Sequence, residues 1–287
     1  MYAGEVLALV GESGAGTSLT ARAVLGLTPR GAAVSGRGAL RGAPVTAADL
    51  GRWLAWIPQD AMSALSPVHR VDRQLALAVR SEASATPGAR LRRGEARAVA
   101  RRALADVGLS GRAASAYPYA LSGGMRQRAV IAMGLVNRPE LVVADEPTTA
   151  LDPARREQVL GLLRERCAAT GAALLLVSHD LAAVRRHADR VAVMYAGRLV
   201  ETGPAAQVLG QPLAPYTRGL LASLTAPGLP RRSRLPAPDG VQPPPGSVGR
   251  GCAFAPRCAH TTAVCRGEEP GPRPVDGRLI ACHHPPD

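Results

Sequence analysis

The sequence predicts an α/β fold in which a parallel β-sheet is covered by helices on both faces. Four short apolar runs have the length of buried strands, and they are Val6–Val10, Leu141–Ala144, Leu174–Val177 and Arg190–Met194. Helical stretches separate these runs, and strands that alternate with helices along a chain form parallel sheets. With 287 residues and 46% hydrophobic residues, the chain suffices for one large domain with an appendage.

A glycine-rich loop follows the first apolar run. Residues 11–18 read GESGAGTS, and glycines at this spacing let successive backbone N–H groups turn toward a phosphate. A helix that starts behind the loop favours an anion at its N-terminus, and Ser18 can offer its hydroxyl to Mg²⁺. We therefore expect these residues to bind the phosphates of a nucleotide: Gly11, Ser13, Gly14, Ala15, Gly16, Thr17 and Ser18.

This loop lacks its usual cation. The phosphate-binding pattern requires lysine immediately before Ser18, and the chain has Thr17 there. All 35 basic residues are arginines, and the nearest one, Arg22, lies one helical turn farther on and should point away from the phosphates. An opposite charge about 4 Å away contributes roughly 4 kcal/mol at an intermediate dielectric. The sequence leaves two interpretations open: a recent or incidental substitution, with ATP binding weakened but not abolished, and a nucleotide site that no longer turns over.

The middle of the chain is expected to be helical. Residues 61–137 lie between the sheet-forming parts, and Glu95–Val107 reads as an amphipathic helix. Its apolar positions at helical spacing are Val99, Ala103, Leu104 and Val107. We expect the alternation of strands and helices to end at Gly203-Pro204. The Pro-, Gly- and Arg-rich stretch at about 227–251 is expected to be a linker.

Three further motifs follow the loop in a fixed order. LSGGMRQR at 121–128 precedes LVVADEP at 141–147, where an apolar strand ends in two carboxylates, and His179 follows the next apolar run. This order resembles the ATP-binding-cassette (ABC) ATPases. The resemblance implies a P-loop NTPase fold, with a RecA-like parallel sheet core, an inserted helical subdomain and a small C-terminal extension that contains cysteines.

The same resemblance implies a composite ATP site. In this family two such domains sandwich ATP head to tail, so each site draws on both chains. The catalytic residues would be Glu146, which polarises the attacking water, and His179, which contacts the γ-phosphate. Mg²⁺ would be held by Ser18, Gln59 and Asp145. The signature motif that caps the partner's nucleotide would be Leu121, Ser122, Gly123, Gly124 and Met125, and Asp152 would lie in the loop that bridges the chains.

Longer stretches narrow the resemblance to one subfamily. They are PQDAMSALSPVHRV at 58–71, AYPYALSGGMRQRAVIAMGL at 116–135, ADEPTTALD at 144–152, RVAVMYAGRLVETGP at 190–204 and PYTRGLL at 215–221. These stretches resemble the ATPase subunits of dipeptide and oligopeptide importers, including some for nickel. Tyr119 departs from the pattern, because the subfamily usually has histidine there.

The subfamily resemblance also predicts the domain organisation. We expect an ABC ATPase nucleotide-binding domain at 1–210, with its helical subdomain at about 61–137, and an oligopeptide/dipeptide-transporter-type C-terminal extension at 211–287. Members of the family have further strands and an adenine-stacking aromatic residue upstream of the loop. We therefore expect that an N-terminal segment is missing, since Tyr2 lies too close to the loop to take that role.

The C-terminal extension holds four cysteines, which are Cys252, Cys258, Cys265 and Cys282. Cysteines of a cytosolic protein are metal ligands more often than disulfide partners, but this spacing is not that of a CxxC zinc ribbon. Members of the subfamily with the same pattern can carry a [4Fe–4S] cluster bound by four thiolates. The alternative is four reduced thiols that pack a small irregular domain. Cys167 lies apart in a helical stretch and is expected to be buried.

These observations predict an ATP-binding subunit that couples ATP hydrolysis to the import of peptides or similar small solutes. The expected cofactors are ATP and Mg²⁺. The expected partners are a second ABC ATPase subunit in a homo- or heterodimer, two membrane permease subunits and, indirectly, a solute-binding protein. No apolar run reaches the roughly 18–20 residues of a membrane span, so we expect a peripheral position at the cytoplasmic face of the membrane.

Two alternative functions remain open. The first is a catalytically impaired or inactive cassette whose LSGG motif completes a partner's ATP site. The second, from another class, is a soluble ABC protein that acts on nucleic acid, because a net charge of +13 attracts polyanions. The complete absence of lysine favours a compositional bias as the source of that charge, so nucleic acid is not the partner we expect.

Overall fold

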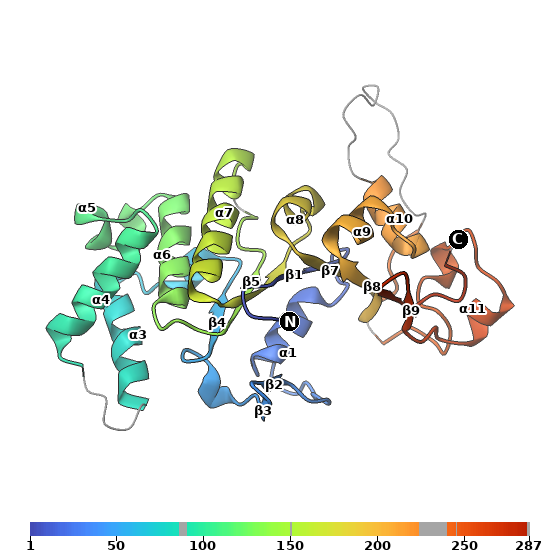
Figure 1. The fold of residues 1–287 in the computed structure, drawn as a ribbon, viewed down its shortest axis with the longest axis horizontal. Helices are drawn as coiled ribbons and strands as arrows, with labels where there is room; N and C mark the ends of the chain where they lie inside the picture. Colours follow the sequence, from blue (N-terminus) through green and yellow to red (C-terminus); the bar gives the residue numbers. More distant parts are fainter. Residues whose placement is uncertain (86–90, 150, 224–239, 245, 286–287) are drawn as a thin grey trace. The chain divides into compact units, whose positions relative to one another are not determined.

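The computed structural model describes residues 1–85, 91–149, 151–223, 240–244 and 246–285 (Figure 1). The chain consists of two compact units: unit 1 comprises Met1–Val6 and Ala21–Leu176, and unit 2 comprises Leu7–Thr20 and Val177–Asp287. The chain passes from one unit to the other within three elements, which are strand β1 (Val6–Val10), helix α1 (Thr17–Val24) and strand β6 (Ala173–Val177).

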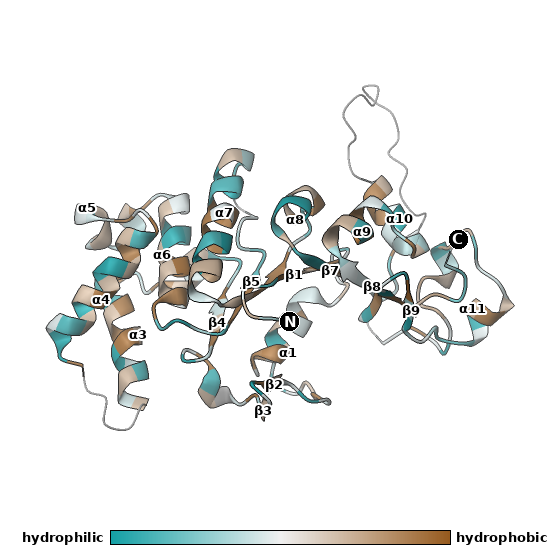
Figure 2. Ribbon diagram, viewed as in Figure 1, coloured by the Kyte–Doolittle hydropathy of each residue, from teal (hydrophilic) through white to brown (hydrophobic). Residues whose placement is uncertain are grey.

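Parallel strands form the centre of unit 1. Strand β4 (Leu54–Ile57) pairs in parallel with β5 (Leu141–Asp145), with Leu54 opposite Leu141, and β6 follows β5 in the strand order. The residues of β6 are all buried, and Figure 2 colours most of β5 toward the hydrophobic end of its scale. Burial on both faces explains why these segments read as continuous apolar runs instead of alternating ones. A separate hairpin joins β2 (Ala39–Leu40) to β3 (Ala43–Pro44).

Helices fill most of the remaining residues of unit 1. Those between β4 and β5 are α2 (Ala61–Ala64), α3 (Val71–Ala85), α4 (Arg93–Asp106), α5 (Gly111–Ala114) and α6 (Gly123–Leu135), and α7 (Pro153–Thr170) follows β5. The expectation of a mainly helical segment at 61–137 agrees with these bounds. No helix in the described ranges is both long and apolar enough to cross a lipid bilayer.

The buried face of α4 agrees with the predicted one only in part. The predicted Leu104 and Val107 are buried, whereas Val99 and Ala103 are only half-buried, and the helix buries Ala96 and Ala100 as well. The reason is that α4 packs against both α3 and α6, and small side chains at such contacts let the helix axes approach closely. Apolar spacing alone does not distinguish a close-packed alanine from a half-exposed valine.

Unit 2 combines a parallel pair of strands with an antiparallel extension. Strand β1 pairs in parallel with β7 (Arg190–Tyr195), and β7 turns back into β8 (Arg198–Pro204). Strand β10 (Arg278–Ile280) pairs antiparallel with both β8 and β9 (Arg273–Val275). The sequence predicted only parallel strands, so these antiparallel pairs are an addition to it. The β7–β8 pair is antiparallel because a tight turn at Ala196-Gly197 joins the two strands, and both turn residues have positive φ, of 47° and 81°.

Four helices accompany these strands, and they are α8 (Leu181–His187), α9 (Ala205–Gly210), α10 (Pro215–Ala222) and α11 (Ala263–Gly267). The expectation that the alternation of strands and helices ends at Gly203-Pro204 is wrong, because α9 begins directly after Pro204. Proline is tolerated where a helix starts, since its missing N–H would have no partner there. Of the expected linker at 227–251, residues 227–239 and 245 lie outside the described residues.

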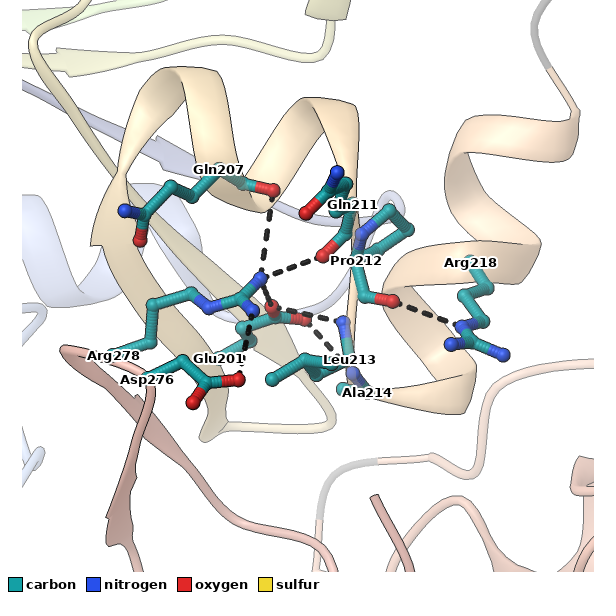
Figure 3. A network of polar contacts seen from close by, with 9 residues as sticks. All are labelled: Glu201, Gln207, Gln211, Pro212, Leu213, Ala214, Arg218, Asp276 and Arg278. Atoms are coloured by element: carbon teal, nitrogen blue, oxygen red, sulfur yellow. Dashed lines mark hydrogen bonds and ion pairs between the residues drawn. The ribbon is translucent and has the colours of Figure 1, made fainter. Parts of the chain in front are cut away.

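A buried ion pair attaches β10 to the rest of unit 2 (Figure 3). Glu201 on β8 and Arg278 on β10 are 1% and 5% exposed, and Arg278 Nη1 lies 3.5 Å from Glu201 Oε1. The carboxylate also accepts hydrogen bonds from the backbone N–H groups of Leu213 and Ala214, at 3.1 and 2.9 Å. Arg278 Nη1 donates to the carbonyl oxygen of Gln211 at 2.6 Å. Both charges are therefore compensated inside the core.

Three aromatic side chains gather in the core of unit 2. The rings of Tyr195 and Tyr216 lie 4.5 Å apart, and Phe254 contacts both at 5.2 and 5.4 Å in edge-on geometry. All three residues are buried. These residues come from β7, from α10 and from the segment before α11, so the cluster joins the C-terminal residues to the central strands.

The buried thiol of Cys167 predicts a loss of stability at alkaline pH. Cys167 lies in α7 and is 1% exposed, and burial raises its pKa from 9.0 to about 12. The unfolded chain releases this proton near pH 9, so the stabilisation is complete below that pH and is lost as the pH rises toward 12. Cys167→Ala should make the free energy of unfolding less steep between pH 9 and 11 by about 1.4 kcal/mol per pH unit. Urea unfolding at several pH values measures this slope, and equal slopes for both proteins would contradict the prediction.

Candidate functional site

The glycine-rich loop of unit 2 lies between β1 and α1. A Cβ atom added at Gly11 would meet the Met194 carbonyl oxygen at 2.5 Å, so only glycine lets the loop lie against β7. Gly14 and Gly16 adopt φ values of 88° and 97°, which side chains with a Cβ rarely tolerate. The Gly197 N–H donates to the carbonyl oxygen of Ala15 at 2.8 Å. The glycine spacing is thus required by this backbone conformation.

Helix α1 begins at Thr17, so the expected helix N-terminus follows the loop. The side chain of Thr17 is half-buried and carries no charge. Arg22, in unit 1, lies with its guanidinium 5.9 Å from the centre of the Trp56 ring. Arg22, the arginine nearest to Thr17 in the sequence, thus makes a cation–π contact with Trp56.

Two predicted residues of unit 1 lie in direct contact at the end of β5. Glu146 accepts hydrogen bonds from Gln59 Nε2 at 3.2 Å and from Thr149 Oγ1 at 2.9 Å. Asp145, the residue before it, is 3% exposed. Glu146 adopts φ = 46°, in the left-handed region that residues other than glycine usually avoid. Strain of this kind clusters at functional sites, although tight turns such as Ala196-Gly197 also show it.

The strain at Glu146 can be measured with two substitutions that both remove the carboxylate. Glu146→Gly relieves the left-handed backbone conformation, whereas Glu146→Ala keeps a Cβ there. We expect the Gly variant to be more stable than the Ala variant by about 1 kcal/mol. Chemical unfolding of the two proteins measures the difference. An Ala variant as stable as the Gly variant would show that Glu146 is not strained.

The predicted signature motif caps a helix of unit 1. Ser122 is the N-cap of α6, where its hydroxyl accepts a hydrogen bond from the Met125 N–H at 3.4 Å. The exposed serine and the two glycines after it therefore present a helix N-terminus to the surface. Asp152 is the N-cap of α7 and accepts from the Arg155 N–H at 3.0 Å. His179 is exposed in unit 2, just before the N-cap of α8.

The predicted site residues divide between the two units. Unit 2 carries the loop at 11–18 and His179, whereas unit 1 carries Gln59, Asp145, Glu146, the signature motif at 121–125 and Asp152. Within unit 1 the structure brings Gln59 and Glu146 together. Within unit 2 the loop is also contacted by residues that the sequence did not single out, among them Tyr216 and Arg257. PYTRGLL at 215–221 was noted only as a subfamily stretch, so no signal marked Tyr216 as a loop contact.

The four cysteines of the extension line one small cavity of about 30 Å³, together with His260, His283 and His284. Burial raises the pKa of Cys252, Cys258 and Cys282 above its ordinary value. In the described part of the chain, no group of three or more His, Cys, Asp or Glu side chains is placed to hold a metal ion. The four thiolates are donor types that suit a [4Fe–4S] cluster, but the expectation of a cluster gains no support from the described residues.

Comparison with known proteins gives two family matches. The family described as "ABC transporter" matches residues 1–149, and "Oligopeptide/dipeptide transporter, C-terminal region" matches residues 200–265. The second match covers part of the stretch in which the antiparallel strands and the cysteines lie.

Individual proteins agree with these families. The "probable peptide ABC transporter ATP-binding protein y4tR" of Sinorhizobium fredii is 40% identical over 97% of this chain and 85% of its own length. The "dipeptide transport ATP-binding protein DppD" of Haemophilus influenzae is 37% identical over 98% of this chain and 86% of its own. A dimeric structure of the ATP-binding cassette MJ0796, in a post-hydrolysis state with ADP and Pi, superposes with a TM-score of 0.60 and 25% identity, over 70% of this chain and 86% of that one.

These matches cover both the phosphate loop and the C-terminal residues. They confirm the predicted fold class, a P-loop NTPase with a mostly parallel sheet, and they imply ATP and Mg²⁺ as nucleotide and ion. They also identify the enzyme as an ATPase of the transport-coupled class. The chain belongs to the ABC transporter family, as an ATP-binding subunit that carries the oligopeptide/dipeptide-transporter C-terminal region.

Proposed function

We propose that this chain binds ATP with Mg²⁺ and couples its hydrolysis to the import of peptides through partner permeases. The observation that carries the proposal is the contact between Gln59 and the strained Glu146 at the end of a buried strand. The peptide assignment is supported by the named relatives and by the match of the C-terminal region.

In this proposal each motif has one task. The amides of the loop at 11–18 and the N-terminus of α1 bind the phosphates. Glu146, oriented by Gln59 and Thr149, accepts a proton from the attacking water, and His179 donates to the γ-phosphate. Ser18, Gln59 and Asp145 offer a hydroxyl, an amide oxygen and a carboxylate, which are oxygen ligands that suit Mg²⁺. The ion, when bound, offsets the negative charge of the phosphates.

The proposed ATP site is shared with a second ABC ATPase subunit in a homo- or heterodimer. The exposed N-terminus of α6, with the motif from Leu121 to Met125, would face the nucleotide of that partner. Asp152, at the exposed start of α7, would lie in the loop between the two subunits. Thr17 leaves this chain's own loop without its cation, so we propose that its site is slow and that its signature motif serves the partner's site.

We further propose that a permease helix docks into a groove of unit 1. The groove has a volume of about 600 Å³, and its lining includes Leu27, Trp56 and Met133, with Arg52 and Glu82 beside them. Trp56 lies on β4, whose C-terminal end leads directly to Gln59. A helix seated there would act on the strand that positions the catalytic carboxylate. The chain would thus lie at the cytoplasmic face of the membrane, held there by two permeases and served indirectly by a solute-binding protein.

The domain division at 1–210 and 211–287 is part of the proposal, as is a helical subdomain at about 61–137. No step of the proposal involves a [4Fe–4S] cluster at the four tail cysteines. Action on nucleic acid is the weaker alternative, since the relatives reported above are named for peptide transport.

Reconstitution in vesicles tests the proposal. The complex contains this chain, a partner ATPase with an intact loop, both permeases and the solute-binding protein, and uptake of a labelled peptide is followed with ATP inside. Ser122→Arg should stop uptake, because it blocks the partner's site, whereas Glu146→Gln should leave part of it. Ser110→Arg, at the exposed N-cap of α5, is the matched control.

Two results would contradict the proposal. If Glu146→Gln stopped all uptake, the site with Thr17 would be essential and the idea of one slow site would be wrong. If the complex hydrolysed ATP but took up no peptide, the substrate class would be wrong.

A further inference from the structure

An ion pair connects the C-terminal residues of unit 2 to the phosphate loop. Arg257 Nη1 donates to Glu12 Oε2 at 2.9 Å, and Arg257 Nη2 donates to Glu12 Oε1 at 3.2 Å, so the pair is bidentate. The Arg257 side chain is 8% exposed. Glu12 is the second residue of the loop, directly after Gly11. A mostly buried guanidinium is thus fixed to the loop by two parallel charge-assisted hydrogen bonds.

Two further side chains from the same part of the chain contact the loop. The Glu12 N–H donates to the hydroxyl of Tyr216 on α10 at 3.0 Å. The Gln242 amide lies against Gly14, since a Cβ added there would be 3.3 Å from Gln242 Nε2. Residues after position 210 therefore contact the loop at a backbone N–H, at a carboxylate and at a glycine.

Arg257 is itself held from several sides. Its Nη1 donates to the Tyr195 hydroxyl at 3.3 Å, and its guanidinium lies 5.6 and 5.8 Å from the ring centres of Tyr195 and Phe254. Burial opposes the charge, but the hydrogen bonds to Glu12 and Tyr195 outweigh it and raise the Arg257 pKa above its ordinary value. The aromatic cluster fixes Arg257, and Arg257 in turn fixes the carboxylate of Glu12.

We infer that Arg257 is a positioning residue of the nucleotide site, which acts through Glu12 to hold the phosphate loop in its phosphate-binding conformation. The inference rests on the proposed role of residues 11–18. It makes the C-terminal extension a working part of the ATP site, in addition to any contact with other proteins. Arg257 does not replace the missing lysine, because Glu12 neutralises its charge.

Because the loop lacks lysine, its affinity for phosphate depends more strongly on the ion pair between Arg257 and Glu12. Without a cation at Thr17, the loop binds phosphates mainly through its backbone N–H groups. Those groups bind well only if they already point inward, since ordering a loop on binding costs affinity. Because Arg257 fixes the loop at Glu12, the loop is already ordered before ATP binds, and less affinity is lost to ordering it.

Hydrogen exchange of the nucleotide-free chain of residues 1–287 is the first measurement. Arg257→Gln should speed exchange in a peptide that covers residues 11–18. Arg198→Gln is the matched control, because the Arg198 side chain pairs with Glu269 (2.7 Å) and donates to the carbonyl oxygen of Gly251 (3.1 Å), and both partners lie outside residues 11–18. The second measurement is ATP affinity, which Arg257→Gln should weaken by about 10- to 100-fold. Arg257→Lys should recover part of the loss, since lysine keeps the charge but not the bidentate geometry.

A double-substitution cycle separates positioning from general stability. If Arg257 acts through Glu12, Arg257→Gln should cause little further loss of affinity in a Glu12→Gln background. Additive losses, or an equal loss in Arg198→Gln, would overturn the inference. Unchanged exchange of residues 11–18 in Arg257→Gln would also overturn it, even if the native chain bound no ATP. A native chain without ATP binding but with faster exchange in the variant would instead contradict the proposed function and support the contact.

Discussion

Thr17→Lys is expected to tighten the binding of ATP by this chain by about 10- to 1,000-fold. Thr17 is the first residue of α1, directly after Gly16 with its positive φ, which is the position that lysine occupies in the usual phosphate loop. An ammonium group about 4 Å from a phosphate contributes roughly 4 kcal/mol at an effective dielectric of 20, and exposure to solvent reduces that value. The glycine conformations needed for the loop are already present, so the substitution adds only the charge.

Calorimetric titration with ATP and Mg²⁺ measures the effect. Thr20→Lys is the matched control, because Thr20 lies exposed on the same helix one turn farther along. A gain in the control equal to that in Thr17→Lys would show a general effect of charge. Unchanged affinity in Thr17→Lys would mean that backbone amides and Mg²⁺ suffice, and the proposed asymmetry between the two ATP sites would lose its physical basis.

The strands of the parallel sheet could be predicted because burial on both faces leaves a strong signal. The runs Val6–Val10, Leu141–Ala144, Leu174–Val177 and Arg190–Met194 coincide with β1, β5, β6 and β7 to within a residue or two. Strand β4 was not predicted, since its four residues include Trp56, which is only half-buried. The helix at 95–107 was placed correctly, and its buried face was predicted at Leu104 and Val107 but not at Ala96 and Ala100, because alanines carry a weak hydrophobic signal.

The antiparallel strands of unit 2 could not be predicted from the sequence, because short strands and long-range charge pairs leave no local pattern. Strands β9 and β10 have only three residues each, and two of those in β10, Arg278 and Leu279, do not read as a buried pair. Arg278 is buried because Glu201, 77 positions away, compensates its charge. The contact of Arg257 with Glu12 spans 245 positions. No local pattern reveals such pairings, since each residue alone reads as an ordinary surface charge.

The candidate site was predictable as a series of motifs but not as geometry. The order of the loop, LSGG, the Asp145-Glu146 pair and His179 indicates the chemistry. Only the structure shows that Gln59 donates to Glu146 and that Glu146 has a strained backbone. The strain depends on the backbone conformation of the turn that follows β5, so it could not be predicted from the amino-acid sequence.

Glu201→Leu is expected to lower the free energy of unfolding by about 3–5 kcal/mol, the cost of leaving one charge of a buried pair uncompensated. The substitution leaves the guanidinium of Arg278 without its carboxylate. It also removes the acceptor of two backbone N–H groups, those of Leu213 and Ala214. A Cβ added at Gly203 would lie 2.5 Å from Arg278 Cγ, so the arginine stem is closely surrounded and has little room to reach solvent.

The opposite substitution should cost less, and this asymmetry is the sharper part of the prediction. Arg278→Met keeps the two backbone donors for Glu201, so its carboxylate retains partners, and methionine fills most of the arginine volume. We expect a loss of about 2 kcal/mol, measured by urea unfolding beside Glu165→Gln as a control for an exposed ion pair. Equal losses in Glu201→Leu and Arg278→Met would mean that the ion pair, and not the backbone donors, sets the stability. In that case Glu201 would matter for its charge alone, and the segment between α9 and α10 would not depend on it.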